Sequence, residues 1–235
     1  IPDGKLVGLL GPSGCGKTTM LNIIGGLDGY TDGDLYINGR STKGYKDRDW
    51  DTYRNHSVGF VFQSYNLISH QTVLQNVELA LTLTGVSKAE RRKRAIAALE
   101  QVGLADQIKK KPSEMSGGQM QRMLLARIFA LRPKVLIADE PTSMVDACVR
   151  ANILDYLMKL KQELQMTIVF VTHDIGLANY VSDRIFIMHD GKIVNQGTPE
   201  EVLDKTQEPH TLKLLDDIPE VHKTEWIKNS HRSKK

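Results

Sequence analysis

The stretch GPSGCGKT at residues 11–18 decides the fold predicted for this chain. It fits the pattern G-x-x-x-x-G-K-[ST], and it lies between a short apolar run, KLVGLL at residues 5–10, and helical sequence from residue 17 to about residue 24. In such a strand–loop–helix unit, backbone N–H groups converge on phosphate oxygens at the positive end of the helix dipole. The sequence therefore predicts a phosphate-binding loop at residues 11–19.

The residue types of this loop predict a bound nucleotide with a metal ion. In loops of this pattern the lysine, here Lys17, reaches the β- and γ-phosphates, and the hydroxyl that follows, here of Thr18, ligates Mg²⁺. Thr19 is expected to contact phosphate rather than metal, and Cys15 needs no role beyond its small size. Nucleotide contacts are predicted from Gly11, Ser13, Gly14, Cys15, Gly16, Lys17, Thr18 and Thr19.

Two carboxylates follow a second apolar run, VLIADE at residues 135–140. A continuous apolar run of this length predicts a parallel strand that is buried on both faces. At its end, Asp139 is placed to hold Mg²⁺, and Glu140 is placed to orient or deprotonate an attacking water. Acids often end strands, but the loop at residues 11–19 in the same chain favours a catalytic role for this pair.

A second anion site is predicted at SGGQ, residues 116–119. Ser116 can cap a helix that runs from residue 117 to about residue 131, and two glycines at its start expose backbone donors. A capping serine with flexible glycines is the simpler interpretation of such a stretch, but here the chain already has one phosphate loop. Nucleotide contacts are therefore also predicted from Ser116, Gly117, Gly118 and Gln119.

These motifs and their order resemble those of the nucleotide-binding domains of ABC transporters, over essentially the whole chain. The resemblance identifies Gln63 as the Q-loop glutamine, residues 143–146 as the D-loop and His173 as the switch histidine. It implies that Gln63 senses Mg²⁺ and the attacking water, that His173 contacts the γ-phosphate, and that Asp146 crosses a dimer interface. The implied catalytic residues are Glu140, His173, Gln63 and Lys17, and the implied metal ligands are Thr18, Gln63 and Asp139.

The resemblance also implies a cofactor and partners. ATP with Mg²⁺ would be held between residues 11–19 of one copy and residues 116–119 of another, in a homodimer or heterodimer of ATPase domains. Transmembrane transporter subunits would receive the closing and opening motion of this dimer. The resemblance therefore also implies a cytoplasmic protein, peripheral on the inner face of the cell membrane.

Strands that alternate with helices predict an α/β fold, and the resemblance implies a P-loop NTPase (RecA-like) parallel-sheet core with an inserted helical subdomain and a partial antiparallel β portion. Further strands are expected at residues 35–38, 57–63 and 167–171, with a hairpin at 184–197 and a helix that Thr198 caps. We divide the chain into the first part of the ATPase core (1–63), the helical subdomain with the signature motif (64–130), the second part of the core (131–205) and a C-terminal extension (206–235).

Composition indicates an ordinary globular protein of 235 residues, 40% hydrophobic and 25% charged, with a formal net charge of +3. Such a mild charge, without a clustered basic stripe, argues against nucleic acid as a partner. No apolar run approaches the roughly 18–20 residues that span a bilayer, so a membrane role requires another polypeptide. The two cysteines have no metal-ligand spacing and weakly favour a reducing compartment.

Two features depart from the family pattern. The chain starts only about ten residues before Gly11, so the upstream strands and the aromatic residue that stacks on adenine are expected to be missing, which would weaken adenine binding and expose a sheet edge. In addition, residues 59–81 are similar to ATPases of macrolide-export and lipoprotein-release systems. Residues 126–147 and 209–220 are instead similar to those of oligopeptide importers, which predicts a chimera of two branches.

Three alternatives stay open. A soluble ABC-type ATPase acting on nucleic acid or the ribosome would carry coiled-coil heptads or a second such domain, and neither is found in the sequence. A P-loop kinase or GTPase would lack the stretch at residues 116–119. A folded but catalytically silent chimera or fragment remains the third alternative, and release of phosphate from ATP would distinguish it from an enzyme.

Overall fold

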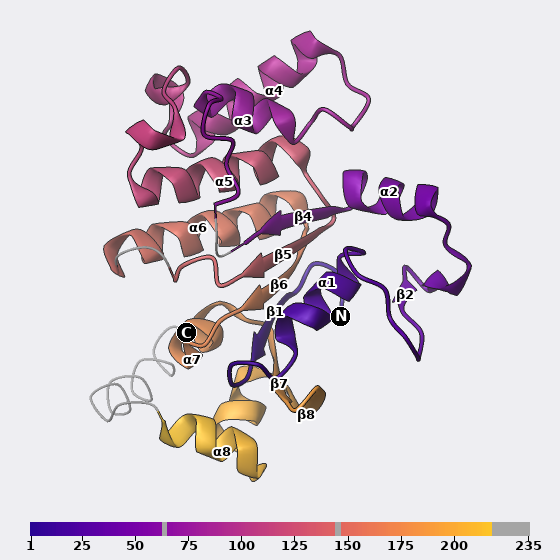
Figure 1. The fold of residues 1–235 in the computed structure, drawn as a ribbon. Coiled ribbons are helices and arrows are strands. Elements are labelled where there is room, and N and C mark those ends of the chain that lie inside the picture. The colour runs from indigo at the N-terminus through magenta and orange to yellow at the C-terminus, as the bar shows by residue number, and fades with distance from the viewer. Residues whose placement is uncertain (63–64, 144–146, 218–235) are drawn as a thin grey trace.

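The computed structural model describes residues 1–62, 65–143 and 147–217. Its centre is a six-stranded sheet in the order β4-β5-β6-β1-β7-β8, in which all neighbours pair in parallel except the antiparallel pair β7 and β8 (Figure 1). The strand that leads into the phosphate loop, β1, therefore lies inside the sheet between β6 and β7. The strands are β1 (Leu6–Leu10), β4 (Val58–Val61), β5 (Val135–Asp139), β6 (Thr167–Val171), β7 (Arg184–His189) and β8 (Lys192–Gly197).

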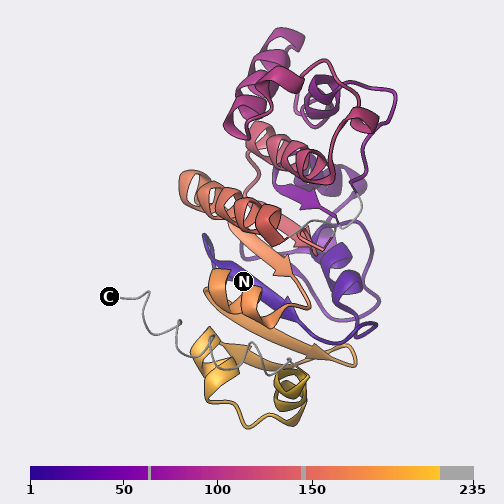
Figure 2. The ribbon, with the colours of Figure 1, turned by 90° about the vertical axis from the view of Figure 1, so that its left-hand side faces the viewer.

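Helices cover both faces of this sheet, as Figure 2 shows. Side chains of β6 alternate between the two layers: Ile168 and Phe170 join one buried cluster with α3 to α6, whereas Val169 and Val171 join another with α1 and α2. This alternation follows from the period of two along a strand. The helices are α1 (Lys17–Ile24), α2 (Asp47–His56), α3 (Val73–Leu79), α4 (Lys88–Gln101), α5 (Gly117–Leu131), α6 (Ala147–Leu164), α7 (Ile175–Val181) and α8 (Pro209–Asp216).

The predicted α/β fold with a parallel-sheet core and a helical insertion is confirmed. The serine caps expected from the sequence are present, because the hydroxyl of Ser87 accepts from the N–H of Glu90 at the start of α4, and the hydroxyl of Ser116 accepts from the N–H of Gln119 at the start of α5. Outside the six-stranded sheet, the antiparallel portion of the described residues is small and consists of β2 (Tyr36–Ile37) and β3 (Arg40–Ser41).

Several elements differ from the prediction, and the helices α7 and α8 are not among those that the sequence predicts. The expected helix after Thr198 is a short π-helical segment, η4 (Glu200–Asp204), although the reciprocal bonds between Thr198 and Glu201 that define a capping box are formed. The helix α2 was not predicted, because its sequence is strongly polar. It is held on the sheet by Tyr53, which is 8% exposed and donates its hydroxyl to the Ile24 carbonyl.

Candidate functional site

The phosphate loop connects the end of β1 to the start of α1, and three of its glycines have positive φ angles: 155° at Gly11, 77° at Gly14 and 98° at Gly16. Side chains are disfavoured in this region of φ. At Gly11 a Cβ atom would also lie 2.2 Å from the Met188 carbonyl oxygen. The loop therefore needs glycine at Gly11 for both conformation and space.

The tip of the β7–β8 hairpin contacts the phosphate loop at Cys15. The N–H of Gly191 donates to the Cys15 carbonyl oxygen at 2.9 Å, and Cys15 is 5% exposed within the cluster that also contains Met188. A small side chain at Cys15 fits this buried position. The sequence did not indicate the hairpin contact, because the two segments are more than 170 residues apart.

The ammonium group of Lys17 lies over the loop. Its Nζ donates to the carbonyl oxygens of Gly11 and Pro12, both at 2.8 Å, and lies 3.7 Å from the Cys15 sulfur. A single positive charge is thus held beside the backbone N–H groups of the loop. An anion bound there would be stabilised both by this charge and by hydrogen bonds from the N–H groups.

Asp139 lies at the end of β5, within hydrogen-bonding reach of the Thr18 hydroxyl. Burial raises the pKa of its carboxyl, and the neighbouring charge of Glu140 raises it further, against a smaller opposite effect of Lys17 and Thr18. A carboxylate and a hydroxyl side by side are oxygen ligands of the kind that Mg²⁺ prefers, and a cation would relieve the repulsion between the two carboxylates. The residues present therefore fit this ion.

Within the described residues, no group of three or more His, Cys, Asp or Glu side chains could hold a metal ion by itself.

Glu140 has a φ angle of 46°, which is unusual for a residue with a side chain. Its N–H donates to the Val171 carbonyl oxygen at 3.0 Å, and its own carbonyl oxygen accepts from the N–H and the hydroxyl of Ser143. Such a conformation persists when the surrounding contacts fix it, and it is typical of functional sites.

The side chains of Glu140 and His173 meet at the ends of β5 and β6. The Nδ1 atom of His173 lies 3.3 Å from Oε1 of Glu140, and the His173 side chain is 73% exposed whereas that of Glu140 is 24% exposed. The histidine therefore borders the carboxylate on its solvent side. The strands β5, β6 and β1 are neighbours in the sheet. The structure therefore brings together, at the C-terminal ends of these strands, the residues Lys17, Thr18, Asp139, Glu140 and His173.

The predicted second anion site lies at the start of α5. Ser116 and Gln119 bond reciprocally through a capping box, with the Gln119 Oε1 atom accepting from the Ser116 N–H at 2.9 Å. Helix α5 packs on the face of the sheet opposite to α1, and no hydrogen bond joins the described residues 116–119 to residues 11–19 (Figure 1). The structure thus does not unite the two anion sites within one chain.

Two of the predicted site residues, Gln63 and Asp146, lie outside the described residues.

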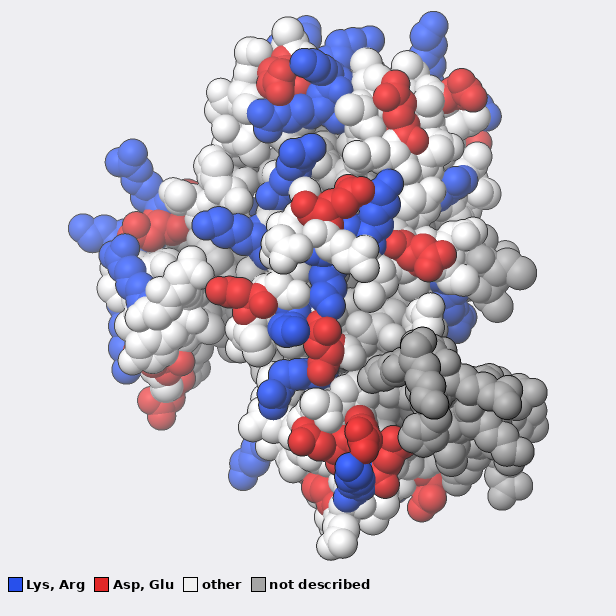
Figure 3. Space-filling view, turned by 180° about the vertical axis from the view of Figure 1, so that it is seen from behind, with Lys and Arg blue, Asp and Glu red and all other residues white. Residues whose placement is uncertain are grey.

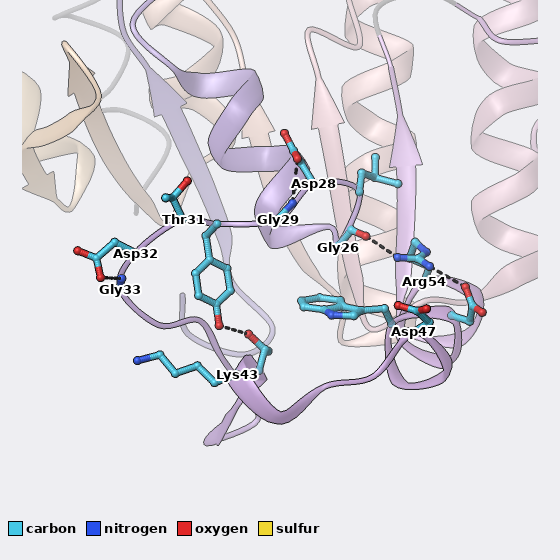
Figure 4. Close-up of a pocket in the computed structure, with 14 residues that line it drawn as sticks. Gly26, Asp28, Gly29, Thr31, Asp32, Gly33, Lys43, Asp47 and Arg54 are labelled. Carbon is cyan, nitrogen blue, oxygen red and sulfur yellow. Dashed lines mark hydrogen bonds and ion pairs between the residues drawn. The ribbon is translucent and has the colours of Figure 1, made fainter.

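A separate open cavity of about 910 Å³ lies beyond the end of α1 (Figure 4). The loop at residues 26–33 forms one side of it, and residues of the short 3-10 helix η1 (Thr42–Gly44) and of α2 form the other. Arg54 donates to the Gly26 carbonyl and to Asp51 (Figure 4), and the Trp50 ring packs so closely on Gly26 that a Cβ added there would lie 2.5 Å from it. This cavity contains none of the residues predicted to bind nucleotide.

The face of the molecule shown in Figure 3 carries basic and acidic side chains in alternation rather than a continuous basic track. Among the described residues, no helix is both long and apolar enough to cross a membrane.

Comparison with known proteins places these features in a family. Residues 1–143 match the family model described as ABC transporter. The chain is 36% identical over 227 residues to the methionine import ATP-binding protein MetN 1 of Rhodopseudomonas palustris, an alignment that covers 97% of this chain and 61% of that protein. It is 42% identical over 235 residues to the sulfate/thiosulfate import ATP-binding protein CysA 2 of Shewanella oneidensis, covering 98% and 64%. The chain thus spans less than two thirds of the length of these relatives.

Two further comparisons cover most of both chains. The chain is 43% identical over 194 residues to the uncharacterized ABC transporter ATP-binding protein YknY of Bacillus subtilis, covering 83% of this chain and 84% of that protein. It is also similar to a dimeric structure of the ATP-binding cassette MJ0796 bound to ADP and Pi, with a TM-score of 0.76, 41% identity, and coverage of 85% of this chain and 87% of that one.

Proposed function

Because the chain belongs to the ABC transporter family of ATP-binding domains, we propose that it hydrolyses ATP as a dimer and drives the transmembrane subunits of a transporter. The observation that carries this proposal is the single sheet edge at which the phosphate loop, the Asp139 and Thr18 oxygens and the Glu140–His173 pair meet.

In the proposed reaction, water attacks the γ-phosphate in line with the leaving oxygen. Backbone N–H groups of residues 11–19 and the Lys17 ammonium hold the phosphates, which is chiefly a matter of positioning and charge neutralisation. Thr18 and Asp139 would hold Mg²⁺, which supplies further neutralisation of phosphate charge, and Gln63 would complete this set.

Glu140 would orient the attacking water and accept its proton. His173 lies 3.3 Å from the Glu140 carboxylate, so it can hold that carboxylate in place and reach the γ-phosphate from the solvent side. Burial and the Glu140 charge raise the pKa of Asp139, so a cation bound between the two carboxylates would favour the ionised form of Asp139.

A second copy of the chain would supply the second anion site. Helix α5, which begins within residues 116–119, packs on the opposite face of the sheet from α1, and this supports a contact of these residues with the nucleotide of another copy rather than with that of their own chain. The related cassette MJ0796 is described as dimeric with bound ADP and Pi, which supports the same arrangement here. Asp146 would lie at this interface.

The relatives named above are ATP-binding proteins of import systems for methionine and for sulfate or thiosulfate. By analogy, this chain would be the ATP-binding part of a transporter and would lie peripherally on the cytoplasmic side of the membrane, where it would pass the opening and closing of the dimer to transmembrane subunits.

The test is steady-state phosphate release from the purified chain with MgATP, at several protein concentrations. We expect turnover that requires Mg²⁺ and that rises per chain as the concentration rises, because the site is completed by a second copy. Glu140→Gln should lower kcat by about 10²–10⁴-fold while ATP binding persists. Glu100→Gln, the same change at an exposed position of α4, is the matched control. Absence of turnover in the unmodified chain, or full turnover in Glu140→Gln, would overturn the proposal.

A further inference from the structure

A buried glutamine connects the helix that begins after Ser116 to the turn that carries Glu140. Gln121 lies in the second turn of α5 and is only 2% exposed, whereas the other buried residues of this helix, such as Met123 and Leu124, are apolar. Its side-chain Nε2 donates to the carbonyl oxygen of Pro141, the residue directly after Glu140. A buried amide group is costly unless it is hydrogen-bonded, so this contact gives the glutamine a specific orientation.

The turn that receives this bond is fixed from several sides. The N–H of Glu140 donates to Val171 on β6, and the Glu140 carbonyl accepts from Ser143 within the turn. The Pro141 carbonyl is the next acceptor along the chain, and its partner comes from α5. The unusual backbone conformation of Glu140 is thus held between a strand on one side and α5 on the other.

We propose that Gln121 is a positioning residue that sets the orientation of Glu140 and couples it to residues 116–119. This inference rests on the proposed function, because it needs Glu140 to act on water and residues 116–119 to contact the nucleotide of a second copy. Helix α5 extends without interruption from Gly117, so a displacement of its first turn moves Gln121 and, through it, the Pro141 carbonyl.

The consequence is a link between the two ATP sites of a dimer. Each chain would contact its partner's nucleotide through the first turn of α5 and hydrolyse its own nucleotide with Glu140, and Gln121 joins these two parts. Such a link is a coupling between sites, and it predicts that hydrolysis depends cooperatively on ATP concentration. Coupling of this kind has to be measured, since proximity alone does not establish it.

The test compares Gln121→Met with Met123→Leu in the full chain. Methionine matches the length of glutamine but has no N–H donor, and Met123→Leu changes a fully buried apolar side chain of the same helix. We expect Gln121→Met to lower kcat by roughly tenfold, as a small misplacement of a catalytic group does. Binding of a fluorescent ATP analogue should change by no more than about twofold, and the Hill coefficient for ATP should fall towards 1. Met123→Leu should keep both kcat and the Hill coefficient.

A second measurement examines whether the effect acts through Glu140. In single turnovers, Gln121→Met should slow hydrolysis in the unmodified background but add no further loss to Glu140→Gln. If Gln121→Met does not fold, Gln121→Asn, which is one methylene shorter, takes its place.

The inference would be overturned, while the proposed function stands, by an unchanged kcat in Gln121→Met. The same holds if Gln121→Met and Met123→Leu both lose rate and ATP binding in proportion to their lowered Tm. Absence of turnover in the unmodified chain would overturn both.

Discussion

Replacement of Gly11 by alanine tests whether the loop depends on this glycine for space as well as for conformation. Gly11 and Gly14 both have positive φ, which costs an alanine about 1–2 kcal/mol. At Gly11 the added Cβ would also meet the Met188 carbonyl oxygen at 2.2 Å and the Cys15 sulfur at 2.8 Å, whereas at Gly14 nothing lies within 4 Å. Overpacking of this kind adds roughly 1–3 kcal/mol. We therefore expect Gly11→Ala to lower the free energy of unfolding by about 2–5 kcal/mol, and Gly14→Ala by about 1–2 kcal/mol.

Urea denaturation of both variants measures this difference, and titration with a fluorescent ATP analogue measures its effect on binding. Gly14→Ala is the matched control, because it adds the same methyl group to the same loop. ATP binding should weaken more in Gly11→Ala, since the Met188 carbonyl cannot move without displacing the β7–β8 hairpin that supports Cys15. Equal losses of stability in the two variants would refute the argument from space and leave only the argument from φ.

Two further predictions concern charge. Asp139→Asn should raise the free energy of unfolding of the nucleotide-free protein at pH 7 and weaken MgATP binding, because the raised pKa of Asp139 means that its ionisation opposes folding. In the unmodified protein this cost should disappear as the pH falls through the raised pKa, and a denaturation series with pH checks the sign. Asp183→Ala should lower the free energy of unfolding by about 2 kcal/mol, since Asp183 accepts from the N–H of Leu6 at 2.7 Å and from Lys161 at 2.6 Å. Burial opposes ionisation of Asp183, but Lys161 and the Leu6 N–H outweigh this effect and lower its pKa. Asp183 therefore stabilises the folded protein fully above the unfolded pKa near 3.9, and this stabilisation is lost as the pH falls through the lower folded pKa. A difference between the variant and the unmodified chain that persists unchanged at acid pH would contradict this reasoning.

The sequence predicted the parallel core well, because its signals are local. The apolar runs of β1, β5 and β6 show no alternation, which is typical of strands buried on both faces, and each is followed at once by residues that are predicted to carry chemistry. Serine caps predicted the starts of α4 and α5 for the same reason, since a cap and the N–H groups it satisfies lie within four residues.

What the sequence did not predict depends on distant partners. The polar helix α2 is stable here because Tyr53 and Trp50 pack against residues near the end of α1, about 25 residues earlier. The hairpin contact below Cys15 and the bond from Gln121 to Pro141 join segments that no periodicity relates. Gln121 carried one signal, a glutamine on the apolar side of a helix. The roles of the site residues, the four-part division of the chain and the composite of two branches remain predictions.

The buried cluster that joins the helical layer to the sheet limits how freely the protein can be taken apart. Leu99 and Met123 from the helical layer share it with Leu136 and Phe170 from the sheet. A recombinant fragment that contained only the middle of the chain would therefore expose this shared surface to water, and aggregation during expression is the expected result. Swapping the helical layer between related ATPases would in turn require transplanting the matching sheet residues as a set.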